Sequence, residues 1–542
     1  MDLRSPANSC TPLCVQTDHR AVFMNRDEML RRVADHRGVW DLIVVGGGAT
    51  GAGVALDAAA RGYAVLLLER SDFGAGTSSR STKLIHGGVR YLRQAHFGLV
   101  IESLRERSRL LHNAPHIVHD LAFVLPCYRR LDVSFYGLGL KAYDLLAGRH
   151  RFGHSRIVST EHVRRLLPTI QPDGLRGGVV YHDGQFDDSR LLIHLLMTAT
   201  DHGAVVLNYA AVTALSRATS GAVDGVYMRD LESGNEFHIK ARVVVNAAGP
   251  FCDEIRRMAN PGSRPLVAAS QGSHIVLDRS FLPGDAALLI PETPDGRVLF
   301  AIPWHGHTLV GTTDLPLISA PVEPRPTHDE VDFILETAGR YLNRSPQRKD
   351  ILSTFAGIRP LVKAGGGNTA SLARDHTIRV EQVGLVTITG GKWTTYRNMA
   401  EACVDKVASL AKLPHRTCPT RELRIHGYDI EATRQGSLAV YGSDALEVNR
   451  LMQADTTLSA PLHPALPYVG AEAVWAVRAE MARTVADVLA RRMRALFLNA
   501  RAAMEMAPRV AELMAREMGR TNDWVASQIG EFLQLAKGYC VE

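Results

Sequence analysis

Runs of apolar residues long enough for buried strands occur at widely separated places in the chain. Residues 41–51 combine such a run with a glycine-rich turn and the start of a helical pattern. Residues 64–69 repeat the strand pattern and end on an acid, which completes a strand, helix and strand unit. Residues 242–246 and 385–389 predict two further buried strands, the second followed by a helical pattern over 394–413. A cofactor-binding α/β domain assembled from separated segments is therefore expected.

The pattern between these segments changes to short alternating stretches. Residues 272–277, 298–302 and 307–311 alternate in this way and are bounded by Pro and Gly, which predicts antiparallel strands of a substrate domain. From about residue 423 the strand pattern fades. Apolar residues then recur at helical spacing over 474–488, with acids before them and arginines after them. The C-terminal quarter is therefore predicted to be helical.

A chain of 542 residues exceeds one compact core, so several structural units are expected. Residues 1–37 contain acids among their arginines and no apolar signal segment, and they are predicted to be a flexible extension. Residues 38–422 are expected to hold a discontinuous cofactor domain with the substrate domain interleaved, and residues 423–542 the helical domain. The expected bounds are about 38–125, 160–265 and 350–415 for the cofactor domain and about 126–159 and 266–349 for the substrate domain.

Composition narrows the class of protein. Hydrophobic residues make up 46% of the chain and charged residues 22%, as in a folded enzyme. The net charge of +6 suits an anionic substrate or membrane surface, and it is too small for this length to indicate nucleic-acid binding. Seven cysteines without a C-x-x-C pair are typical of a reducing compartment. Because no apolar run approaches the ~20 residues that span a membrane, membrane contact would be peripheral.

The turn at 46–51 has the spacing G-x-G-x-x-G, which alone is a weak signal. Its flanking strands and the acid Glu69 at the end of the second strand make a dinucleotide site the better interpretation than an ordinary turn. The glycines let a pyrophosphate approach the helix N-terminus, and Glu69 can accept hydrogen bonds from a ribose. The candidate cofactor residues in this part of the chain are Gly46, Gly48, Gly51, Glu69, Thr77, Ser78, Ser79, Ser81, Thr82 and Lys83.

The first motif does not distinguish a nicotinamide cofactor from FAD. A second glycine pair, Gly390-Gly391, opens a helix some 340 residues later and would place another positive helix end at the far end of an extended cofactor. The hydroxyl-rich run 77–82 suits a cofactor buried along its length. Together these features favour FAD.

Several motifs, in order, resemble the FAD-dependent, aerobic-type glycerol-3-phosphate dehydrogenases. They are STKLIHGGVRY at 81–91, GSHIV at 272–276, IPW at 302–304, GTTD at 311–314, GIRPL at 357–361, ARD at 373–375 and GGKWTTYR at 390–397. The resemblance implies an α/β fold with a Rossmann-like, DAO-type FAD-binding domain, an antiparallel β substrate domain and a C-terminal helical domain. The motifs and the small residues after the late strands add Ala248, Gly249, Thr313, Asp314, Gly390, Gly391 and Thr395 to the cofactor candidates.

The activity that this resemblance implies is oxidation of sn-glycerol 3-phosphate to dihydroxyacetone phosphate. Hydride would pass from C2 to N5 of FAD, and electrons would then pass to a membrane quinone. His86 is the candidate base, because alcohol oxidation needs a proton acceptor and an unperturbed imidazole has a pKa of ~6.5. His274 lies in a matching motif and is the alternative base or a lining residue.

A phosphate dianion needs convergent cations, and three candidates lie beside turns at strand ends: Arg359, Arg374 and Lys392. Lys392 could also stabilise negative charge on a reduced flavin, and both Arg359 and Lys392 are candidate catalytic residues. Arg90 and Tyr91 would complete the substrate pocket. No metal site is predicted, because Pro115 separates His112 from His116 and His119.

Two further segments have competing interpretations. The acids at 183–188 resemble a calcium loop, but the twelfth position is His194 where glutamate is needed, so a helix cap by Asp187 or Asp188 is favoured. Residues 135–151 mix aromatic, aliphatic and basic residues, which suits either an interfacial membrane anchor or core packing.

Other functions stay open at this stage. A glycerol-3-phosphate oxidase using oxygen, another DAO-type flavin oxidoreductase, a nicotinamide dehydrogenase and a flavin-binding regulatory protein are the alternatives. The resemblance implies a cytoplasmic location, peripheral on the inner face of the cell membrane. A homodimer is an open expectation.

Overall fold

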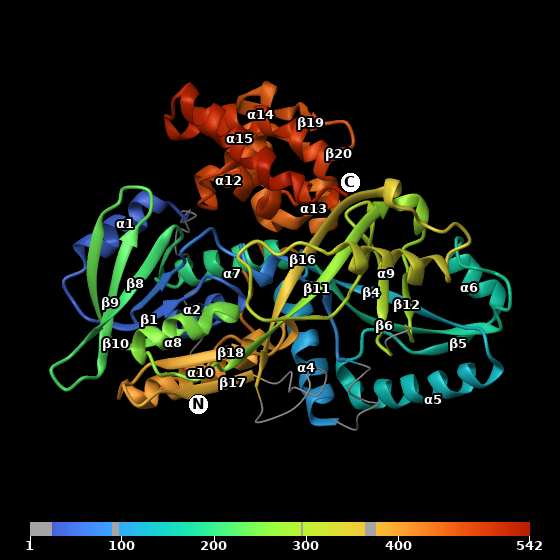
Figure 1. Cartoon of the computed structure of the whole chain (residues 1–542), viewed down its shortest axis with the longest axis horizontal. Coiled ribbons are helices and arrows are strands. Elements are labelled where there is room, and N and C mark those ends of the chain that lie inside the picture. Colours follow the sequence, from blue (N-terminus) through green and yellow to red (C-terminus); the bar gives the residue numbers. More distant parts are fainter. Residues whose placement is uncertain (1–23, 89–96, 294–295, 364–375, 542) are drawn as a thin grey trace, which may run out of the picture.

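Two β-sheets lie side by side, and a helical unit covers their junction (Figure 1). The computed structural model describes residues 24–88, 97–293, 296–363 and 376–541. The first sheet has the order β17, β18, β10, β1, β2, β7, with β9 and β8 continuing from β10. Its centre is β1 (Trp40–Val45), which pairs in parallel with β2 (Val65–Leu68) and β10 (Glu236–Asn246). The other strands are β7 (Val205–Leu207), β8 (Ala210–Arg217), β9 (Val223–Asp230), β17 (His376–Val380) and β18 (Val386–Gly390).

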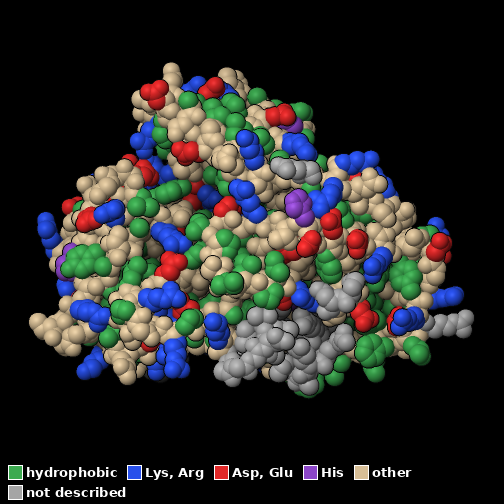
Figure 2. Space-filling model, viewed as in Figure 1, with side chains coloured by type: hydrophobic (Ala, Val, Ile, Leu, Met, Phe, Trp, Pro, Cys, Tyr) green, Lys and Arg blue, Asp and Glu red, His purple; other side chains and the backbone are tan. Residues whose placement is uncertain are grey.

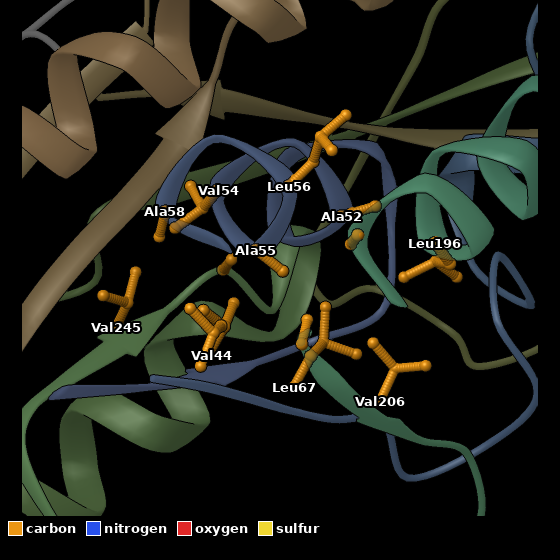
Figure 3. Packing of buried hydrophobic residues seen from close by; sticks show 14 of the residues in the cluster. Val44, Ala52, Val54, Ala55, Leu56, Ala58, Leu67, Leu196, Val206 and Val245 are labelled. Carbon is orange, nitrogen blue, oxygen red and sulfur yellow. The ribbon is translucent and has the colours of Figure 1, made fainter. Parts of the chain in front are cut away.

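Helix α2 (Ala49–Ala60) lies on this sheet and packs between α7 (Asp188–Asp201) and α10 (Tyr396–Leu410). Its small side chains allow the close approach, as Ala55 and Ala58 face Val44 and Val245 in Figure 3. A Cβ at Gly51 would lie 1.8 Å from the Gly46 carbonyl oxygen, so only glycine fits there. This packing fixes the glycine turn at the carboxyl end of β1.

The second sheet is mostly antiparallel and has the order β15, β11, β14, β13, β12, β4, β6, β3, with β16 beside β11 and β5 beside β6. The parallel pair β12 and β4 joins its two halves. Its strands are β3 (Leu84–Ile85), β4 (Val118–Cys127), β5 (Arg156–Val158), β6 (Gly177–Phe186), β11 (Val267–Asp278), β12 (Ala287–Ile290), β13 (Leu299–Trp304), β14 (His307–Gly311), β15 (Leu315–Leu317) and β16 (Ile351–Val362). The helices beside or between these strands are α4 (Phe97–Asn113), α5 (Arg130–Ala147), α6 (Thr160–Leu166) and α9 (His328–Gly339), whereas α8 (Cys252–Ala259) contacts β8, β10 and β18 of the first sheet.

The C-terminal unit is helical, as predicted, with one short hairpin of β19 (Pro461–His463) and β20 (Leu466–Val469). Its main helices are α11 (Ala445–Ala454), α12 (Gly470–Ala479), α13 (Ala495–Leu498), α14 (Ala500–Met518) and α15 (Asn522–Lys537). The continuous helical pattern expected over 474–488 is wrong beyond Ala479. Met481 has a positive φ of 54°, and a π-helix, η10 (Asp487–Arg492), follows.

The predicted strands at 41–45, 64–69, 242–246, 272–277, 298–302, 307–311 and 385–389 are confirmed, although β10 begins six residues and β11 five residues before the predicted start. The distribution of strands between the two sheets differs from expectation. The ranges expected for the cofactor domain contain β3, most of β4, β6 and β16. In the structure β3 and β4 both pair with β6, and β16 pairs with β11, all in the second sheet. The long antiparallel pairings determine the sheet to which each of these strands belongs, and the strands nearest in sequence do not.

The predicted flexible extension is wrong for residues 24–37. Helix α1 (Arg26–Asp35) buries Met29 and Val33, and Met24 forms a bridge with Glu480. Arg26 is buried, and its guanidinium donates to Asp230 Oδ1 at 2.5 Å and to the Asn208 carbonyl at 3.1 Å. The sequence did not indicate these contacts, because most residues of α1 are charged and such a composition is typical of an exposed segment.

Arg26→Ala is expected to lower the stability by about 3 kcal/mol, because it leaves the buried Asp230 without its cation. The thermal unfolding midpoint should fall by several degrees. Arg31→Ala is the matched control on the same helix, since Arg31 pairs with Glu28 in solvent, and it should change the midpoint little. Equal midpoints for the two variants would contradict this role for α1.

Candidate cofactor and substrate site

A cavity of about 1460 Å³ runs between the two sheets and is closed in part by the C-terminal unit. At one end it is lined by the β1 turn and by residues after β2, including Gly46, Gly48 and Glu69. At the other end it is lined by His86, His274 and Arg359. The cavity therefore joins the dinucleotide motif to the predicted reacting groups.

The carboxylate of Glu69 is held at the end of β2 by backbone donors. The amide N of Gly47 donates to Oε2 at 2.6 Å, and that of Ser71 donates to Oε1 at 2.8 Å. Burial raises the pKa of Glu69, and the two backbone hydrogen bonds oppose that rise. Gly46 has a φ of 114°, and a Cβ there would lie 2.6 Å from the Ala247 carbonyl oxygen. The turn therefore requires glycine at this position, because its backbone packs directly against that of Ala247.

The hydroxyl-rich loop lies against the N-terminus of α2. Ser78 Oγ accepts from the amide N of Ala49 at 2.9 Å, and the Ser78 carbonyl accepts from Trp393 Nε1 at 2.9 Å. Thr77 Oγ1 donates to the Ile358 carbonyl at 2.6 Å. These contacts join the first sheet, the second sheet and the segment after β18 at one point of the cavity.

Lys83 does not line the cavity, although it was a predicted cofactor residue. Its side chain is completely buried, and Nζ donates to Asp188 Oδ2 at 2.6 Å and to the Ser79 carbonyl at 2.8 Å. Burial, partly offset by Asp188, lowers the pKa of Lys83 to about 7. Ser81 donates to the same carboxylate through both its amide and its hydroxyl. Asp188 thus anchors the loop from below the cavity.

His274 lines the cavity from β11 and is almost completely buried. Its Nε2 lies 2.9 Å from Thr82 Oγ1, and its ring stacks on Phe355. Burial, with the nearby charges of Lys83 and Arg359, holds the pKa of His274 well below its ordinary value. The neutral imidazole is therefore the favoured form.

Arg359 projects from β16 toward the start of the β14 to β15 turn. Its Nη2 donates to Thr312 Oγ1 at 2.9 Å and to the Thr313 carbonyl at 3.0 Å, and its Nη1 lies 3.3 Å from Asp314 Oδ1. Arg297 lines the same part of the cavity and donates to the Asp314 carbonyl at 3.0 Å. Lys392 lines the cavity as well. Arg297 and Arg359 therefore lie together beside Asp314, and Lys392 is a third cation in the wall of the same cavity, where an anionic group of a substrate could bind.

The turn that carries His86 is held by its neighbour Gly87. The amide N of Gly87 donates to Tyr143 Oη at 2.9 Å and to Asp183 Oδ1 at 3.3 Å. Tyr143 Oη donates in turn to Asp183, and Arg107 Nη1 donates to Asp183 Oδ1 at 2.5 Å. Burial, with the nearby Asp183 carboxylate, raises the pKa of Tyr143 well above its ordinary value, so the phenol stays protonated. Tyr143 therefore connects helix α5 with the backbone beside His86.

The structure brings most predicted site residues together. The residues that line the cavity are Gly46, Gly48, Glu69, Thr77, Ser78, Ser81, Thr82, His86, Ala248, Gly249, His274, Thr313, Asp314, Arg359, Gly390, Gly391 and Lys392. Gly51, Ser79, Lys83 and Thr395 do not line it. Arg90, Tyr91 and Arg374 lie outside the described residues.

The sequence analysis missed four residues of this region. Asp183, Arg297 and Arg491 line the cavity, and Tyr143 binds the backbone amide beside His86. None of the four stands in a position that its own segment marks as functional. Asp183 was visible only as part of an apparent calcium loop. The other acids of that loop have different roles: Asp187 caps α7, as predicted, by accepting from the amides of Ser189 and Arg190, and Asp188 binds Ser81 and Lys83.

A nucleotide cradle joined by one cavity to histidines and cations defines an oxidoreductase of the nucleotide-cofactor α/β class. A family model described as FAD dependent oxidoreductase matches residues 41–397, and one described as the C-terminal domain of alpha-glycerophosphate oxidase matches residues 386–524. The chain belongs to the FAD-dependent oxidoreductases and, within them, to the FAD-dependent glycerol-3-phosphate dehydrogenase family.

The individual similarities extend over nearly the whole chain. A mitochondrial glycerol-3-phosphate dehydrogenase of Arabidopsis thaliana is 42% identical, and the match covers 92% of this chain and 85% of the relative. A probable mitochondrial glycerol-3-phosphate dehydrogenase of Caenorhabditis elegans is 41% identical, with 89% and 71% covered. The structure of a glycerol-3-phosphate dehydrogenase from Bacillus halodurans complexed with FAD is 30% identical, with a TM-score of 0.78 over 96% of this chain and 98% of that one.

FAD is the cofactor of this family, and the cavity residues fit it. Gly46 and Gly48 of the β1 turn line the cavity at the N-terminus of α2, where a pyrophosphate would bind, and Glu69 presents a carboxylate for ribose hydroxyls. The cavity continues from there to His86 and Gly390, as a long dinucleotide requires. The predicted cofactor and the DAO-type fold are thereby confirmed.

Tyr143→Phe is expected to leave Gly87 with a weaker acceptor and to misplace His86. A lost hydrogen bond of about 1 kcal/mol corresponds to a roughly fivefold to tenfold slower flavin reduction by substrate. Hydrogen exchange at Gly87 should become faster in the same variant, which a stopped-flow assay alone would not show.

Tyr128→Phe is the matched control, since Tyr128 donates to the Gln171 carbonyl away from the cavity. It should change neither quantity. If the flavin of Tyr143→Phe were reduced at the wild-type rate, and hydrogen exchange at the Gly87 amide were unchanged, the contact between α5 and the backbone beside His86 would not contribute to the reaction.

Proposed function

We propose that the protein oxidises sn-glycerol 3-phosphate to dihydroxyacetone phosphate and passes the electrons to a membrane quinone. The observation that carries this proposal is one cavity in which a dinucleotide cradle continues into a pocket with His86, Arg359, Arg297 and Lys392. The relatives named glycerol-3-phosphate dehydrogenase support the substrate. The quinone is supported by surface features described below.

The residues of the chain divide the reaction between them. Oxidation of a secondary alcohol removes a hydride from carbon and a proton from oxygen, and FAD, when bound, supplies the hydride acceptor. His86 takes the hydroxyl proton. Arg359, Arg297 and Lys392 bind the phosphate dianion and thereby hold C2 in place. The backbone contacts of Gly87 keep His86 in position.

His86 is a better base than His274. Burial and two nearby cations disfavour the imidazolium form of His274, so it is a weak proton acceptor. Its hydrogen bond with Thr82 instead fixes the loop that carries the hydroxyl groups. We therefore assign proton removal to His86 and loop positioning to His274.

The pH dependence of kcat/KM separates these roles. A base accepts a proton only when neutral, so kcat/KM should rise with pH through the pKa of the base. His274→Asn is expected to keep the midpoint of that rise, because His274 is already neutral over the range of the assay. His86→Asn should lower kcat/KM by at least a hundredfold and abolish the rise. A shifted midpoint in His274→Asn would reverse the assignment.

An anaerobic visible spectrum tests the reaction itself. Addition of sn-glycerol 3-phosphate to the purified holoprotein should bleach the oxidised-flavin band, whereas glycerol at the same concentration should not, because it lacks the anion that the cations bind. Bleaching followed by fast reoxidation in air would favour an oxidase, and slow reoxidation in air with fast reoxidation by a quinone would favour the dehydrogenase. A flavin spectrum unchanged by glycerol 3-phosphate would refute the substrate.

Helix α5 presents an apolar stripe to solvent. Leu131, Phe135, Leu138 and Leu145 are all more than 60% exposed and follow one face of the helix. Lys141 on the same helix and Arg149, Arg151 and Arg156 beyond it are exposed as well. Hydrophobic side chains emerge at the lower right of Figure 2, where α5 lies in Figure 1. An apolar stripe flanked by cations is typical of a helix that lies in an anionic membrane surface.

The same helix also lines the cavity. Phe135 and Leu138 of the stripe, with Tyr136 and Leu140 of α5 and Phe300 from β13, give this part of the cavity an apolar wall. An apolar quinone could enter there from a lipid surface. No helix among the described residues is long and apolar enough to span a bilayer. We therefore propose peripheral attachment through α5, in the cytoplasm at the inner face of the cell membrane; the homodimer stays a prediction.

Leu131→Glu with Leu145→Glu should weaken binding to vesicles of phosphatidylcholine and phosphatidylglycerol at least tenfold, because two charges enter the apolar stripe. Neither side chain lines the cavity, so flavin reduction should be unchanged. Leu446→Glu, at an exposed leucine of α11, is the control and should leave vesicle binding intact. Unchanged vesicle binding, or a dimer that dissociates in the double variant while the wild type ignores vesicles, would contradict the membrane assignment.

A further inference from the structure

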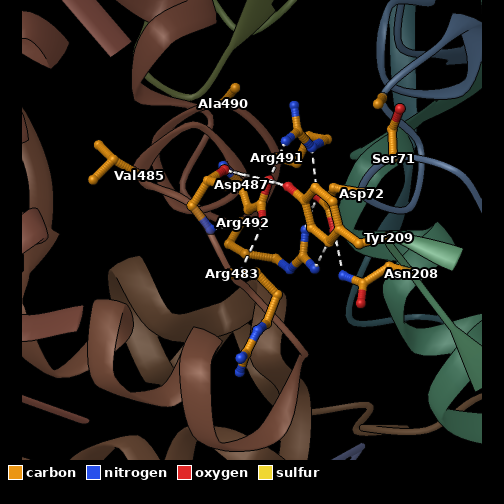
Figure 4. A network of polar contacts seen from close by, with 12 residues as sticks. Ser71, Asp72, Asn208, Tyr209, Arg483, Val485, Asp487, Ala490, Arg491 and Arg492 are labelled. Carbon is orange, nitrogen blue, oxygen red and sulfur yellow. Dashed lines mark hydrogen bonds and ion pairs between the residues drawn. The ribbon is translucent and has the colours of Figure 1, made fainter. Parts of the chain in front are cut away.

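A cluster of buried charges joins the C-terminal unit to the loop that follows β2. Asp72 in that loop accepts from Arg491 Nε, and from Arg492 Nη1 at 2.6 Å and Nη2 at 2.9 Å (Figure 4). Asp72 and Arg492 are completely buried as side chains, and Arg491 is nearly so. The sequence separation of about 420 residues shows that this contact fixes one domain against another.

The π-helix η10 allows both arginines to reach the same carboxylate. Its wider turn places the neighbours Arg491 and Arg492 on the side that faces Asp72. Asp487, at its start, accepts from Arg491 Nη2 at 2.5 Å and from the amides of Arg483 and Thr484 at 2.7 Å and 2.9 Å. Two carboxylates therefore bind the Arg491 guanidinium, Asp72 at Nε and Asp487 at Nη2.

The same cluster forms a wall of the cofactor cavity. Arg491, Thr484 and Ala486 line the cavity together with Ser71 and Tyr209. Tyr209 Oη donates to Asp487 Oδ1 at 2.7 Å, and the Tyr209 amide donates to the Ser71 carbonyl at 3.0 Å. Figure 4 shows Tyr209 and Ser71 on one side of the cluster and the π-helix on the other.

This wall stands at the adenosine end of the cavity. Ser71 donates to Glu69, whose carboxylate is the ribose acceptor in the dinucleotide motif. The C-terminal unit therefore reaches the half of the cavity that is remote from His86 and Arg359. Stability alone is a weak reason for such a network, because a buried ion pair commonly gains little over apolar packing.

We propose that the C-terminal helical unit is a clamp on the cofactor: Arg491, positioned by Asp487 and Asp72, closes the adenosine end of the cavity with Tyr209 and sets the rate at which FAD is released. The clamp requires FAD as the cofactor and does not depend on the substrate. Failure of the glycerol 3-phosphate assignment would therefore leave it standing.

The test is FAD release from the holoprotein, followed by the rise in flavin fluorescence after dilution. Arg491→Gln is expected to release FAD at least tenfold faster than the wild type. Arg483→Gln is the matched control, since Arg483 belongs to the same segment and its side chain pairs with Glu232 away from the cavity. It should release FAD within twofold of the wild type.

Two further measurements separate a clamp from general loosening of the fold. In one measurement, ADP is added during dilution to compete with FAD for the empty site. The ADP to FAD ratio that halves FAD rebinding should be the same in Arg491→Gln and in the wild type, because FAD and ADP both lose the contact with Arg491. The flavin midpoint potential should be unchanged, because the change lies at the remote end. Tyr209→Phe removes only one hydroxyl and should release FAD about threefold faster, so the proposal can be tested even if Arg491→Gln does not fold.

Wild-type release rates in folded Arg491→Gln or in Tyr209→Phe would overturn the clamp. Faster release with an altered ADP to FAD ratio or a shifted midpoint potential would also overturn it, since the contact would then lie elsewhere on the cofactor. Equal acceleration in Arg483→Gln would assign the effect to loosening of the whole C-terminal unit.

Discussion

The segment between β2 and residue 88 carries much of the site, yet it forms only a three-residue 3-10 helix at Thr77–Ser79 and the two-residue strand β3. Its position therefore depends on buried carboxylates that accept from it or bind it to other elements. Asp188 holds Ser81 and Lys83, and Asp183 holds the amide of Gly87. Asp72, within the segment, is bound by two arginines of the C-terminal unit. These charges hold the segment together with the hydrogen bonds that Thr77, Ser78 and Thr82 form with other elements.

Buried charges give this segment specificity more than stability. A carboxylate removed from water loses several kcal/mol of solvation, which the opposite charges and hydrogen bonds roughly repay. Although burial favours its protonated form, Arg492 and Arg491 hold the pKa of Asp72 below its ordinary value. The charged residues that hold the segment come from different elements: Asp183 from β6, Asp188 from α7, and Arg491 and Arg492 from the π-helix of the C-terminal unit. The site consequently forms only when both sheets and the helical unit have assembled.

Much of the architecture could be predicted from local patterns. The apolar run of β1, the glycine turn and the acid Glu69 mark the dinucleotide unit because all three are close in sequence. The strands β10, β11 and β18 were predicted for the same reason. Arg359 and Lys392 were found through motifs, and the cavity brings them together with His86.

The rest depends on contacts between distant residues. Nothing near Tyr143 indicates that its hydroxyl reaches Gly87 from α5, 56 residues away. The helical spacing of 474–488 conceals the break at Met481 and the π-helix, because these follow from the burial of Glu480 and Asp487 among arginines. Lys83 resembles a phosphate ligand in sequence, but its side chain forms a buried ion pair with Asp188 and does not line the cavity. Helix α1 was missed because its few apolar residues find their partners only in the folded sheet.

We place the cofactor in one cavity, with its adenosine end at Glu69 and its reacting end at His86. A crystal structure of the holoprotein with a phosphate-bearing substrate analogue measures this most directly. We expect the adenosine between Glu69 and Arg491, the flavin ring beside His86 and Gly390, and the phosphate within hydrogen-bond distance of Arg359. A phosphate bound away from Arg359, or a flavin ring at the Glu69 end, would contradict it.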